Sequence, residues 1–467
     1  MTKTIDLIES GFLSRWLRGY YERNNVPGFV VAVAKDGKVI LNEAYGYANS
    51  ETKEEMTTSH LFRIASHSKT FTATAIMQLQ EQGKLKIDDN IVDYLPWLKE
   101  HKDKRFLNVT VRQILSHGAG IIRDGYDQGF WSLEMPYPDG NRLKDEILKY
   151  DLVVENNLRM KYSNYGYSLL GLLVEAVSGV GYNEYVSRNI IKKLGLESTG
   201  PEYTDKIKTS LATGYTRVNS DRSRTPITKP VNTGAMSSAT GFYSSSNDIC
   251  KYFSAHIIGD NELLSNESKK EMQRTQWKGN KTFDDGEYGL GLDIDFIDDY
   301  RIFGHSGGFP GFTTRTWVYP EERIVITILF NCLGVPVGQV GRSIMKTVLL
   351  SCINSSKLDQ SLTPYQGRFE KLSHSVDFIV HSDKLLSTNT SSIYPLDAAE
   401  ELVRVEEDNT FKIICTSSYG SEGEMVKFKL NQNGQVEYVV YAGAKLLPQA
   451  VYRKKFEKMK EIASPNE

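Results

Sequence analysis

The chain carries, at residues 62–73, the stretch Phe62-Arg63-Ile64-Ala65-Ser66-His67-Ser68-Lys69-Thr70-Phe71-Thr72-Ala73. It sets Ser66 at the predicted start of a helix and Lys69 three residues later. At this spacing both side chains project from one helical face, so the amine can reach the hydroxyl and take its proton. The amide of the serine would also lie among the unpaired N–H groups of the helix start, which stabilise an oxyanion. The stretch therefore predicts a nucleophilic serine with its base.

The Ser-x-x-Lys spacing alone does not identify a nucleophile, because a chain of this length should contain it about twice by chance. A second match, Ser343-Ile344-Met345-Lys346, lies in an apolar run after the last predicted strand, and we interpret it as structural. Tyr47-Ala48-Asn49 matches a Tyr-x-Asn pattern, but it precedes Ser66 and ends a predicted strand, so we expect a turn there. The choice between the matches depends on the motifs that accompany them.

Length and composition indicate a globular chain with more than one domain. It has 467 residues, of which 40% are hydrophobic and 24% charged, and a formal net charge of −2. Single hydrophobic cores stop growing below this size, so we expect one large domain and a smaller one. No basic excess exists to neutralise phosphates, so nucleic acid is not an expected partner.

The sequence shows neither a targeting signal nor a membrane span. Residues 1–25 carry acids and bases throughout and lack the apolar core and cleavage site of a signal peptide. No stretch approaches the roughly 18 uncharged apolar residues of a spanning helix. We therefore expect a soluble, cytoplasmic protein without a membrane partner, provided that Met1 is the native start. The four cysteines are scattered without a Cys-x-x-Cys pair, which predicts reduced, mostly buried thiols and no structural metal.

The order of the predicted elements indicates an α/β (α+β) fold. After an N-terminal helix come two β-rich runs, 29–34 and 38–45, joined through Asp36-Gly37, a strong hairpin signal. A mainly helical stretch extends from about residue 65 to 261. Strand-like runs then return at 300–304, 312–319 and 323–331, and an apolar run at 340–353 predicts a closing helix. Strands at both ends of a helical segment predict one antiparallel sheet built from both ends, flanked by helices, with a helical insert.

The C-terminal part of the chain is predicted to form a separate small domain. Around residues 355–364 the composition becomes polar and turn-rich, as in a linker. Beyond it, apolar residues alternate in runs such as 426–430 and 436–440. We predict a main domain over residues 1–354, a linker over 355–364, and an all-β barrel or sandwich over 365–467.

Two further motifs follow the Ser66 stretch in order. They are Lys161-Tyr162-Ser163-Asn164-Tyr165-Gly166-Tyr167 and Phe303-Gly304-His305-Ser306-Gly307-Gly308-Phe309-Pro310-Gly311-Phe312. In this order and context the three motifs resemble the serine β-lactamase and penicillin-binding protein superfamily, specifically the class C-like branch of D-aminopeptidases and family VIII esterases. The resemblance covers roughly residues 5–353. It implies a β-lactamase-like serine hydrolase domain that needs neither a cofactor nor a metal.

Each motif residue then has an expected role. Ser66 attacks a carbonyl carbon and carries the acyl group, and Lys69 is a base if burial or a nearby cation lowers its pKa. Tyr162 serves either as that base or as the proton shuttle to the leaving group, a choice that the sequence leaves open. Asn164 would hold both Lys69 and the acyl-side amide of the substrate. By resemblance, His305-Ser306-Gly307 lies on a sheet edge that borders the cleft, and the N–H of Gly308 is the second oxyanion donor beside that of Ser66.

His305 departs from the usual pattern of the superfamily, in which a lysine pairs with the substrate carboxylate. A mostly neutral imidazole does this less well at pH 7, and histidine here is typical of the aminopeptidase and esterase branch. We therefore predict an esterase or a D-amino-acid peptidase or amidase that acts on a small ester, amide or short peptide. The alternatives are true β-lactamase or penicillin-binding activity, and a catalytically weak binding or assembly protein on the same scaffold. The β domain resembles the lipocalin-like tails of some members, where it would shape the cleft or mediate a homo-oligomer.

Other residues near the motifs have predicted roles outside the chemistry. We expect His117, within Ser-His-Gly, to be a structural hydrogen-bonding residue, and His67, which points off the Ser66–Lys69 face, to have a surface or packing role. A long Gly/Asp/Pro-rich connection between Gly118 and Leu143 carries several aromatic residues. Long loops of this kind tend to be functional or disordered. Its Phe130 and Trp131 would either form a lid over the cleft or plug the loop into the helical part.

Overall fold

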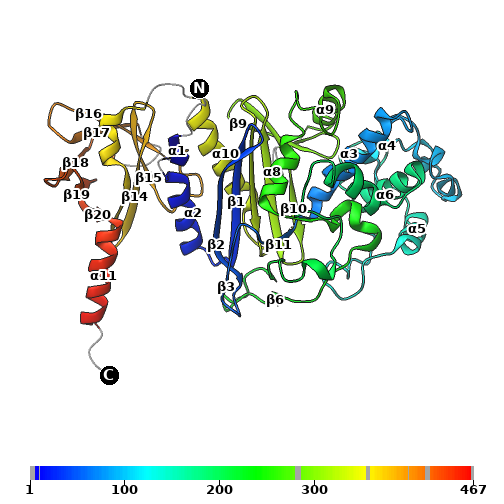
Figure 1. Ribbon diagram of the computed structural model, residues 1–467, viewed down its shortest axis with the longest axis horizontal. Helices are drawn as coiled ribbons and strands as arrows, with labels where there is room; N and C mark the ends of the chain where they lie inside the picture. Colours follow the sequence, from blue (N-terminus) through cyan, green and yellow to red (C-terminus); the bar gives the residue numbers. More distant parts are fainter. Residues whose placement is uncertain are drawn as a thin grey trace. The chain divides into compact units, whose positions relative to one another are not determined.

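A computed structural model describes residues 6–9, 11–278, 286–353, 358–397, 399–415 and 421–463 (Figure 1). The chain divides into two compact units, one of residues 25–341 and one of residues 1–24 and 342–467. The predicted linker, residues 355–364, lies partly outside the described residues, and its described part enters the short 3₁₀ helix Gln360–Tyr365. The predicted domain boundary at this linker stays a proposal.

Residues 25–341 contain an eight-stranded sheet in the order β3-β2-β1-β12-β11-β10-β9-β8. The strands are β1 (Gly28–Lys35), β2 (Lys38–Asn49), β3 (Glu54–Glu55), β8 (Glu287–Tyr288), β9 (Asp293–Ile297), β10 (Tyr300–Phe309), β11 (Phe312–Tyr319) and β12 (Ile324–Phe330). All neighbouring strands are antiparallel, and β1 pairs with β12 in the middle of the sheet. The predicted antiparallel sheet built from both ends is therefore confirmed.

The hairpin between β1 and β2 follows from its two turn residues. Asp36 and Gly37 have φ angles of 50° and 73°, the left-handed conformation that a two-residue hairpin turn requires at both positions. β2 continues to Asn49, and Tyr47 and Asn49 pair with β3. The turn predicted at Tyr47-Ala48-Asn49 is therefore the last part of a strand, because β3 extends the pairing.

The segment between the two halves of the sheet is mainly helical, as predicted. Its helices are α3 (Ser68–Glu81), α4 (Val111–Leu115), α5 (Gly140–Lys149), α6 (Asn164–Ser178), α7 (Tyr182–Val186), α8 (Ser246–Ser254) and α9 (Asn266–Gln273). Short strands interrupt it at β4 (Phe62–Arg63), β5 (Gly214–Tyr215), β6 (Pro226–Ile227) and β7 (Tyr243–Ser244). α8 packs against β1 and β12, whereas α4, α5 and α6 gather at the right of Figure 1. α3 is buried from Ser68 to Leu79, so Lys69 on this helix lies inside the core.

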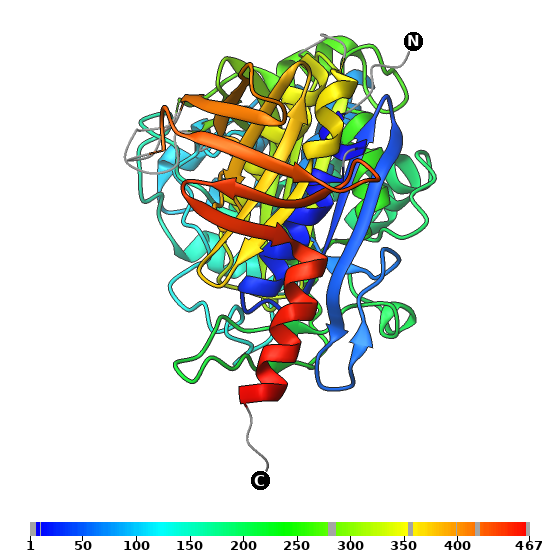
Figure 2. The same ribbon diagram turned by 90° about the vertical axis from the view of Figure 1, so that its left-hand side faces the viewer.

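The second unit contains a closed eight-stranded barrel, which confirms the predicted all-β architecture. Its strands, golden yellow to red in Figure 2, are β13 (Gly367–Lys371), β14 (His374–His381), β15 (Lys384–Asn389), β16 (Glu400–Arg404), β17 (Thr410–Cys415), β18 (Met425–Leu430), β19 (Val436–Tyr441) and β20 (Ala444–Pro448). The C-terminal helix α11 (Gln449–Ala463) leaves the barrel after β20.

The N-terminal helices belong to the barrel's unit. They are α1 (Asp6–Glu9) and α2 (Phe12–Arg23), and the helix α10 (Val337–Ile353) enters the same unit at residue 342. The indole N–H of Trp16 on α2 donates to the carbonyl of Ser392 at 3.0 Å, and the N–H of Leu7 donates to the hydroxyl of Ser351 at 3.3 Å. Helices α1 and α2 therefore pack with the last quarter of the chain.

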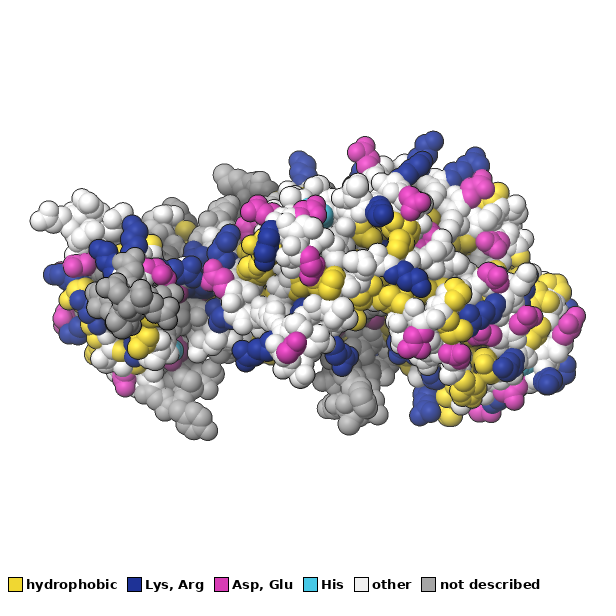
Figure 3. Space-filling model, turned by 90° about the horizontal axis from the view of Figure 1, so that it is seen from below, with side chains coloured by type: hydrophobic (Ala, Val, Ile, Leu, Met, Phe, Trp, Pro, Cys, Tyr) yellow, Lys and Arg dark blue, Asp and Glu magenta, His cyan; other side chains and the backbone are white. Residues whose placement is uncertain are grey.

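Basic and acidic side chains are interspersed on the face shown in Figure 3, in line with the net charge of −2. Within the described ranges, every helix is too short or too polar to span a bilayer. Cys250, Cys332 and Cys352 are buried, as predicted, and the side chain of Cys415 lies outside the described residues.

Candidate active site

Ser66 lies in a tight turn that leads into α3. Residues Ala65–His67 form a 3₁₀ turn, and α3 begins at Ser68. Ala65 has a φ of 48°, a conformation that a residue with a side chain adopts only when its surroundings enforce it. The hydroxyl of Ser68 does so, because it donates to the carbonyl of Ala65 at 2.5 Å and accepts from the N–H of Phe242 at 3.1 Å. Ser66 keeps partial exposure while its neighbours are buried, so the predicted helix start presents an accessible serine.

The amine of Lys69 reaches the hydroxyl of Ser66 from inside the core. Its Nζ lies 3.0 Å from Ser66 Oγ and donates to Asn164 Oδ1 at 2.7 Å and to the carbonyl of Ala239 at 2.8 Å. The side chain is fully buried. Burial lowers the pKa of Lys69 well below its ordinary value, an effect that the carboxylate of Asp124 partly opposes. The amine is therefore fixed in place and biased toward its neutral form.

Tyr162 lies beside this amine and also beside His117. Lys69 Nζ is 4.9 Å from the centre of the Tyr162 ring, and the His117 ring centre is 4.2 Å from it. Burial raises the pKa of the Tyr162 hydroxyl well above its ordinary value. At neutral pH the tyrosine therefore keeps its proton.

His117 holds the backbone around Tyr162, as predicted for a structural hydrogen-bonding residue. Its Nδ1 lies 3.2 Å from the N–H of Ser163 and accepts from it, which leaves the proton of the neutral imidazole on Nε2. Burial lowers the pKa of His117 well below its ordinary value. His117 is therefore a neutral acceptor, and its hydrogen bond holds the Tyr162–Ser163 peptide in place.

Asn164 connects Lys69 to a buried carboxylate that the sequence did not reveal. It is the first residue of α6, its Oδ1 accepts from Lys69, and its Nδ2 donates to Asp124 Oδ1 at 2.7 Å. Asp124 is 1% exposed, and Arg123 lies 3.2 Å from its other oxygen. Asp124 is one of several acidic residues in a long loop, so no local pattern distinguishes it. The sequence likewise did not predict the role of the Ala239 carbonyl, because every residue carries a backbone carbonyl.

The strand β10 borders the turn of Ser66, and its residues alternate between two faces. Ser306 is partly exposed and Gly308 is exposed, whereas His305 and Gly307 are buried. A side chain at position 307 would lie 2.3 Å from the carbonyl oxygen of Ile64, so only glycine allows the strand to approach the turn this closely. The structure thus brings the predicted glycine-rich segment next to Ser66.

The side chain of His305 lies on the buried side of β10. Its Nε2 is 3.2 Å from the hydroxyl of Tyr288, and its Nδ1 is 2.6 Å from the carbonyl of Ser306. Burial lowers the pKa of His305. The imidazole is therefore neutral at pH 7 and engaged with its neighbours.

The other motif residues from the sequence lie away from this chemistry. His67 is fully buried and contacts the Thr316 hydroxyl at 2.9 Å, which is the packing role among the two that we predicted. In the second Ser-x-x-Lys match, the hydroxyl of Ser343 donates to the carbonyl of Ile393 at 2.5 Å, and Lys346 pairs with Asp397. These contacts are structural, as we expected.

The aromatic loop between Gly118 and Leu143 is anchored in the core. Phe130 is fully buried, as the plug hypothesis requires. Trp131 is partly buried, and its ring centre and that of Tyr137 lie 6.4 and 6.3 Å from the Phe309 ring at the end of β10. Phe130 therefore packs into the helical part as the plug hypothesis predicts, whereas the lid stays a prediction for Trp131.

Comparisons with known proteins concern the family and the fold of the chain. The model of a family described as Beta-lactamase matches residues 13–346. Protein flp of Staphylococcus aureus strain N315 is 25% identical over 316 residues, covering 66% of this chain and 60% of that protein. The chain thus spans 60% of the length of this curated relative.

Two solved structures share the fold. The octameric penicillin-binding protein homologue from Pyrococcus abyssi superposes with a TM-score of 0.64 at 24% identity, over 94% of this chain and 99% of that one. D-amino acid amidase from Ochrobactrum anthropi SV3 has a TM-score of 0.62 at 22% identity, over 74% of this chain and 99% of its own. At these identities the two matches concern the fold alone.

Proposed function

The chain belongs to the beta-lactamase family, and from that premise we propose that it is a serine hydrolase acting through an acyl-enzyme on Ser66. The observation that carries the proposal is the fully buried amine of Lys69, 3.0 Å from the Ser66 hydroxyl. A nucleophile within reach of a base, with a third group that orients the base, is the arrangement of an activated nucleophile. Asn164 is that third group.

In the proposed acylation, Ser66 Oγ bonds to the carbonyl carbon of the substrate while its proton passes to the neutral amine of Lys69. Burial, which lowers the pKa of Lys69, makes that neutral form available. The carbonyl oxygen becomes an oxyanion, toward which the N–H groups of Ser66 and Gly308 would donate. We assign the base to Lys69 because the raised pKa of Tyr162 disfavours a phenolate.

Tyr162 then acts as the proton shuttle when the bond to the leaving group breaks. It gives its phenolic proton to the leaving alcohol or amine and takes one from the ammonium of Lys69, so both residues return to their starting state. Water next attacks the acyl-enzyme, and Ser66 Oγ leaves with a proton. This step releases the acid and restores the free serine.

The proposed substrates are small esters, or amides and short peptides of D-amino acids. The buried neutral imidazole of His305 supports this choice, because it offers no cation to a substrate carboxylate where a lysine would. The D-amino acid amidase with the same fold makes D-amino-acid amides reasonable first compounds to assay. True β-lactamase activity is the competing specificity.

A fluorophosphonate probe tests the nucleophile. We expect labelling of the native chain, none of Ser66→Ala, and unchanged labelling of Ser343→Ala, which removes the serine of the second Ser-x-x-Lys match. Absence of labelling in the native chain would overturn the hydrolase and favour a binding or assembly protein. Persistent labelling of Ser66→Ala would place the nucleophile elsewhere.

A second assay tests the substrate class. Short p-nitrophenyl esters, D-alaninamide and nitrocefin are compared at equal enzyme concentration. We expect turnover of the ester or the amide to exceed that of nitrocefin. Comparable turnover of nitrocefin would contradict the argument from His305.

We also propose that the protein forms a homo-oligomer, since the structural neighbour from Pyrococcus abyssi is described as octameric. Light scattering after size exclusion measures the mass directly. A monomer at micromolar concentration would contradict this proposal without affecting the assignment of Ser66. The cytoplasmic location stays a prediction from the sequence.

A further inference from the structure

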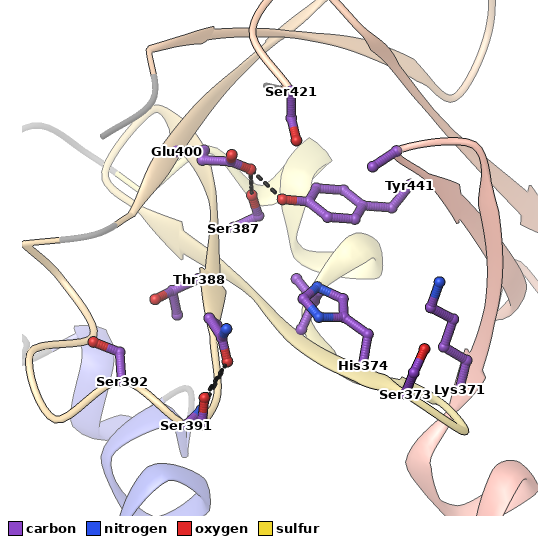
Figure 4. A pocket seen from close by; sticks show the side chains of 13 residues that line it. Lys371, Ser373, His374, Ser387, Thr388, Ser391, Ser392, Glu400, Ser421 and Tyr441 are labelled. Atoms are coloured by element: carbon purple, nitrogen blue, oxygen red, sulfur yellow. Dashed lines mark hydrogen bonds between the residues drawn. The ribbon is translucent and has the colours of Figure 1, made fainter. Parts of the chain in front are cut away.

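The barrel of the second unit contains a cavity of about 610 Å³ (Figure 4). Hydroxyl and amide side chains form most of its wall, together with one carboxylate, Glu400, one ammonium, Lys371, and one imidazole, His374. Cavities of this size hold small molecules. Such molecules are usually bound by apolar contacts, and a few polar groups fix their orientation. Here most of the lining residues carry a polar or charged side chain, so the chemistry of a ligand can be inferred from them.

Glu400 is a buried carboxylate that accepts hydrogen bonds from two hydroxyl groups. It is 5% exposed, accepts from the hydroxyl of Ser387 at 2.9 Å, and also accepts from the hydroxyl of Tyr441. Among the described residues, no lysine, arginine or histidine forms an ion pair with it. A carboxylate can accept about four hydrogen bonds, and a buried one is costly unless a positive charge or further donors compensate it. Glu400 therefore has capacity for a cationic donor from the cavity.

Lys371 lies across the cavity from Glu400 (Figure 4). Their strands, β13 and β16, are separated in the barrel by β14 and β15, which places them on different sides of the ring. Within the described part of the chain, no carboxylate forms an ion pair with Lys371. His374 lies between the two, and burial lowers the pKa of its imidazole, so it offers one neutral donor and one acceptor.

We propose that this cavity binds a small zwitterion, with its ammonium at Glu400 and its carboxylate at Lys371. The ligand class is a free α-amino acid or a short peptide. An apolar ligand would remove water from both charges without replacing it, and a simple anion or cation would satisfy one charge and be repelled by the other. A zwitterion matches both, and the hydroxyl-rich wall suits the amides of a peptide.

Isothermal titration of the full-length chain tests the ligand class. The probes are alanine and dialanine of each hand, with N-acetyl-alanine and alaninamide as matched compounds that each lack one charge. The titrations use Ser66→Ala, so that no peptide is hydrolysed. We expect a zwitterion to bind and both single-charge compounds to bind at least about tenfold more weakly, the usual effect of losing a charged hydrogen bond. The comparison of alanine with dialanine separates an amino acid from a peptide.

Variants in the same background test the location. Glu400→Gln keeps the shape and the hydroxyl contacts, and Lys371→Met removes the ammonium; each should weaken binding about tenfold or more. Glu401→Gln and Lys384→Met are the matched controls, because these neighbours pair with each other at 2.7 Å and do not line the cavity. They should leave the affinity unchanged.

Three results would overturn the proposal. They are no binding of any zwitterion, equal binding of the single-charge compounds, and unchanged binding in both Glu400→Gln and Lys371→Met. In the last case the probe occupies another site, such as the cleft at Ser66. A thermal melt checks that each variant is folded. If Glu400→Gln does not fold, the affinity of Lys371→Met decides the test. The outcome is independent of the hydrolase assignment, since Ser66 is absent throughout.

Discussion

The amine of Lys69 lies in a buried position that favours its neutral form, and this has a measurable consequence for the proposed base. Because burial lowers the pKa of Lys69, the neutral amine persists to lower pH than in water, and protonation by acid removes it. The value of kcat/KM for a p-nitrophenyl ester should therefore rise with pH along a limb centred well below about 10.4, the ordinary value for lysine. A limb centred at or above that value would contradict Lys69 as the base.

Asp124 provides a variant that shifts this limb in a defined direction. Its carboxylate raises the pKa of Lys69, so Asp124→Asn should lower that pKa further and move the ascending limb to lower pH. Asp127→Asn is the control, because Asp127 lies exposed in the same loop. A limb that stays in place in Asp124→Asn, or that moves equally in both variants, would show that the limb does not report Lys69.

At the scale of elements, the approach of β10 to the Ser66 turn depends on one glycine. A Cβ at Gly307 would lie 2.3 Å from the Ile64 oxygen, whereas one at Gly308 would meet nothing within 4 Å. Gly307→Ala should therefore lower the free energy of unfolding by about 1–3 kcal/mol, as overpacking does, and reduce esterase activity. Gly308→Ala should change it by no more than about 0.5 kcal/mol. Urea unfolding measures both, and equal losses would contradict the argument.

The elements that sequence predicts best are those whose signal is local. The β1–β2 hairpin follows from Asp36-Gly37, β11 follows from its β-branched and aromatic residues, and β12 follows from an apolar run that only Thr327 interrupts. β9 was not predicted, because the alternating acids of Asp293–Ile297 form a partly exposed strand next to a short edge strand. The Ser-x-x-Lys spacing likewise predicted that Lys69 would reach Ser66, and the resemblance of the motifs implied that Asn164 would hold Lys69. Asp124 could not be predicted, since only the folded loop brings it to Asn164.

At the scale of the whole molecule, segments that are far apart in the sequence pack together. α2 joins the barrel's unit, and the hydrogen bond from Trp16 to Ser392 spans 376 positions. Trp16 and Leu17 on this helix are almost fully buried. An amphipathic N-terminal helix can be read from sequence, but the partner of its apolar face cannot, because periodicity shows a buried face without showing what covers it. The predicted boundary at residues 355–364 separates α2 from these contacts.

Removing residues 365–467 should therefore destabilise what remains. Side chains such as Trp16 and Leu17 each contribute roughly 1.5–3 kcal/mol when buried, and α2 would lose its partners in the barrel. We expect a lower melting temperature and increased binding of a hydrophobic dye to the chain 1–364. The control removes only residues 449–467, which leaves all eight barrel strands, and should melt close to the full chain. If the chain 1–364 melts cooperatively at the temperature of the full chain without binding dye, the boundary lies in the polar segment and α2 packs independently of the barrel.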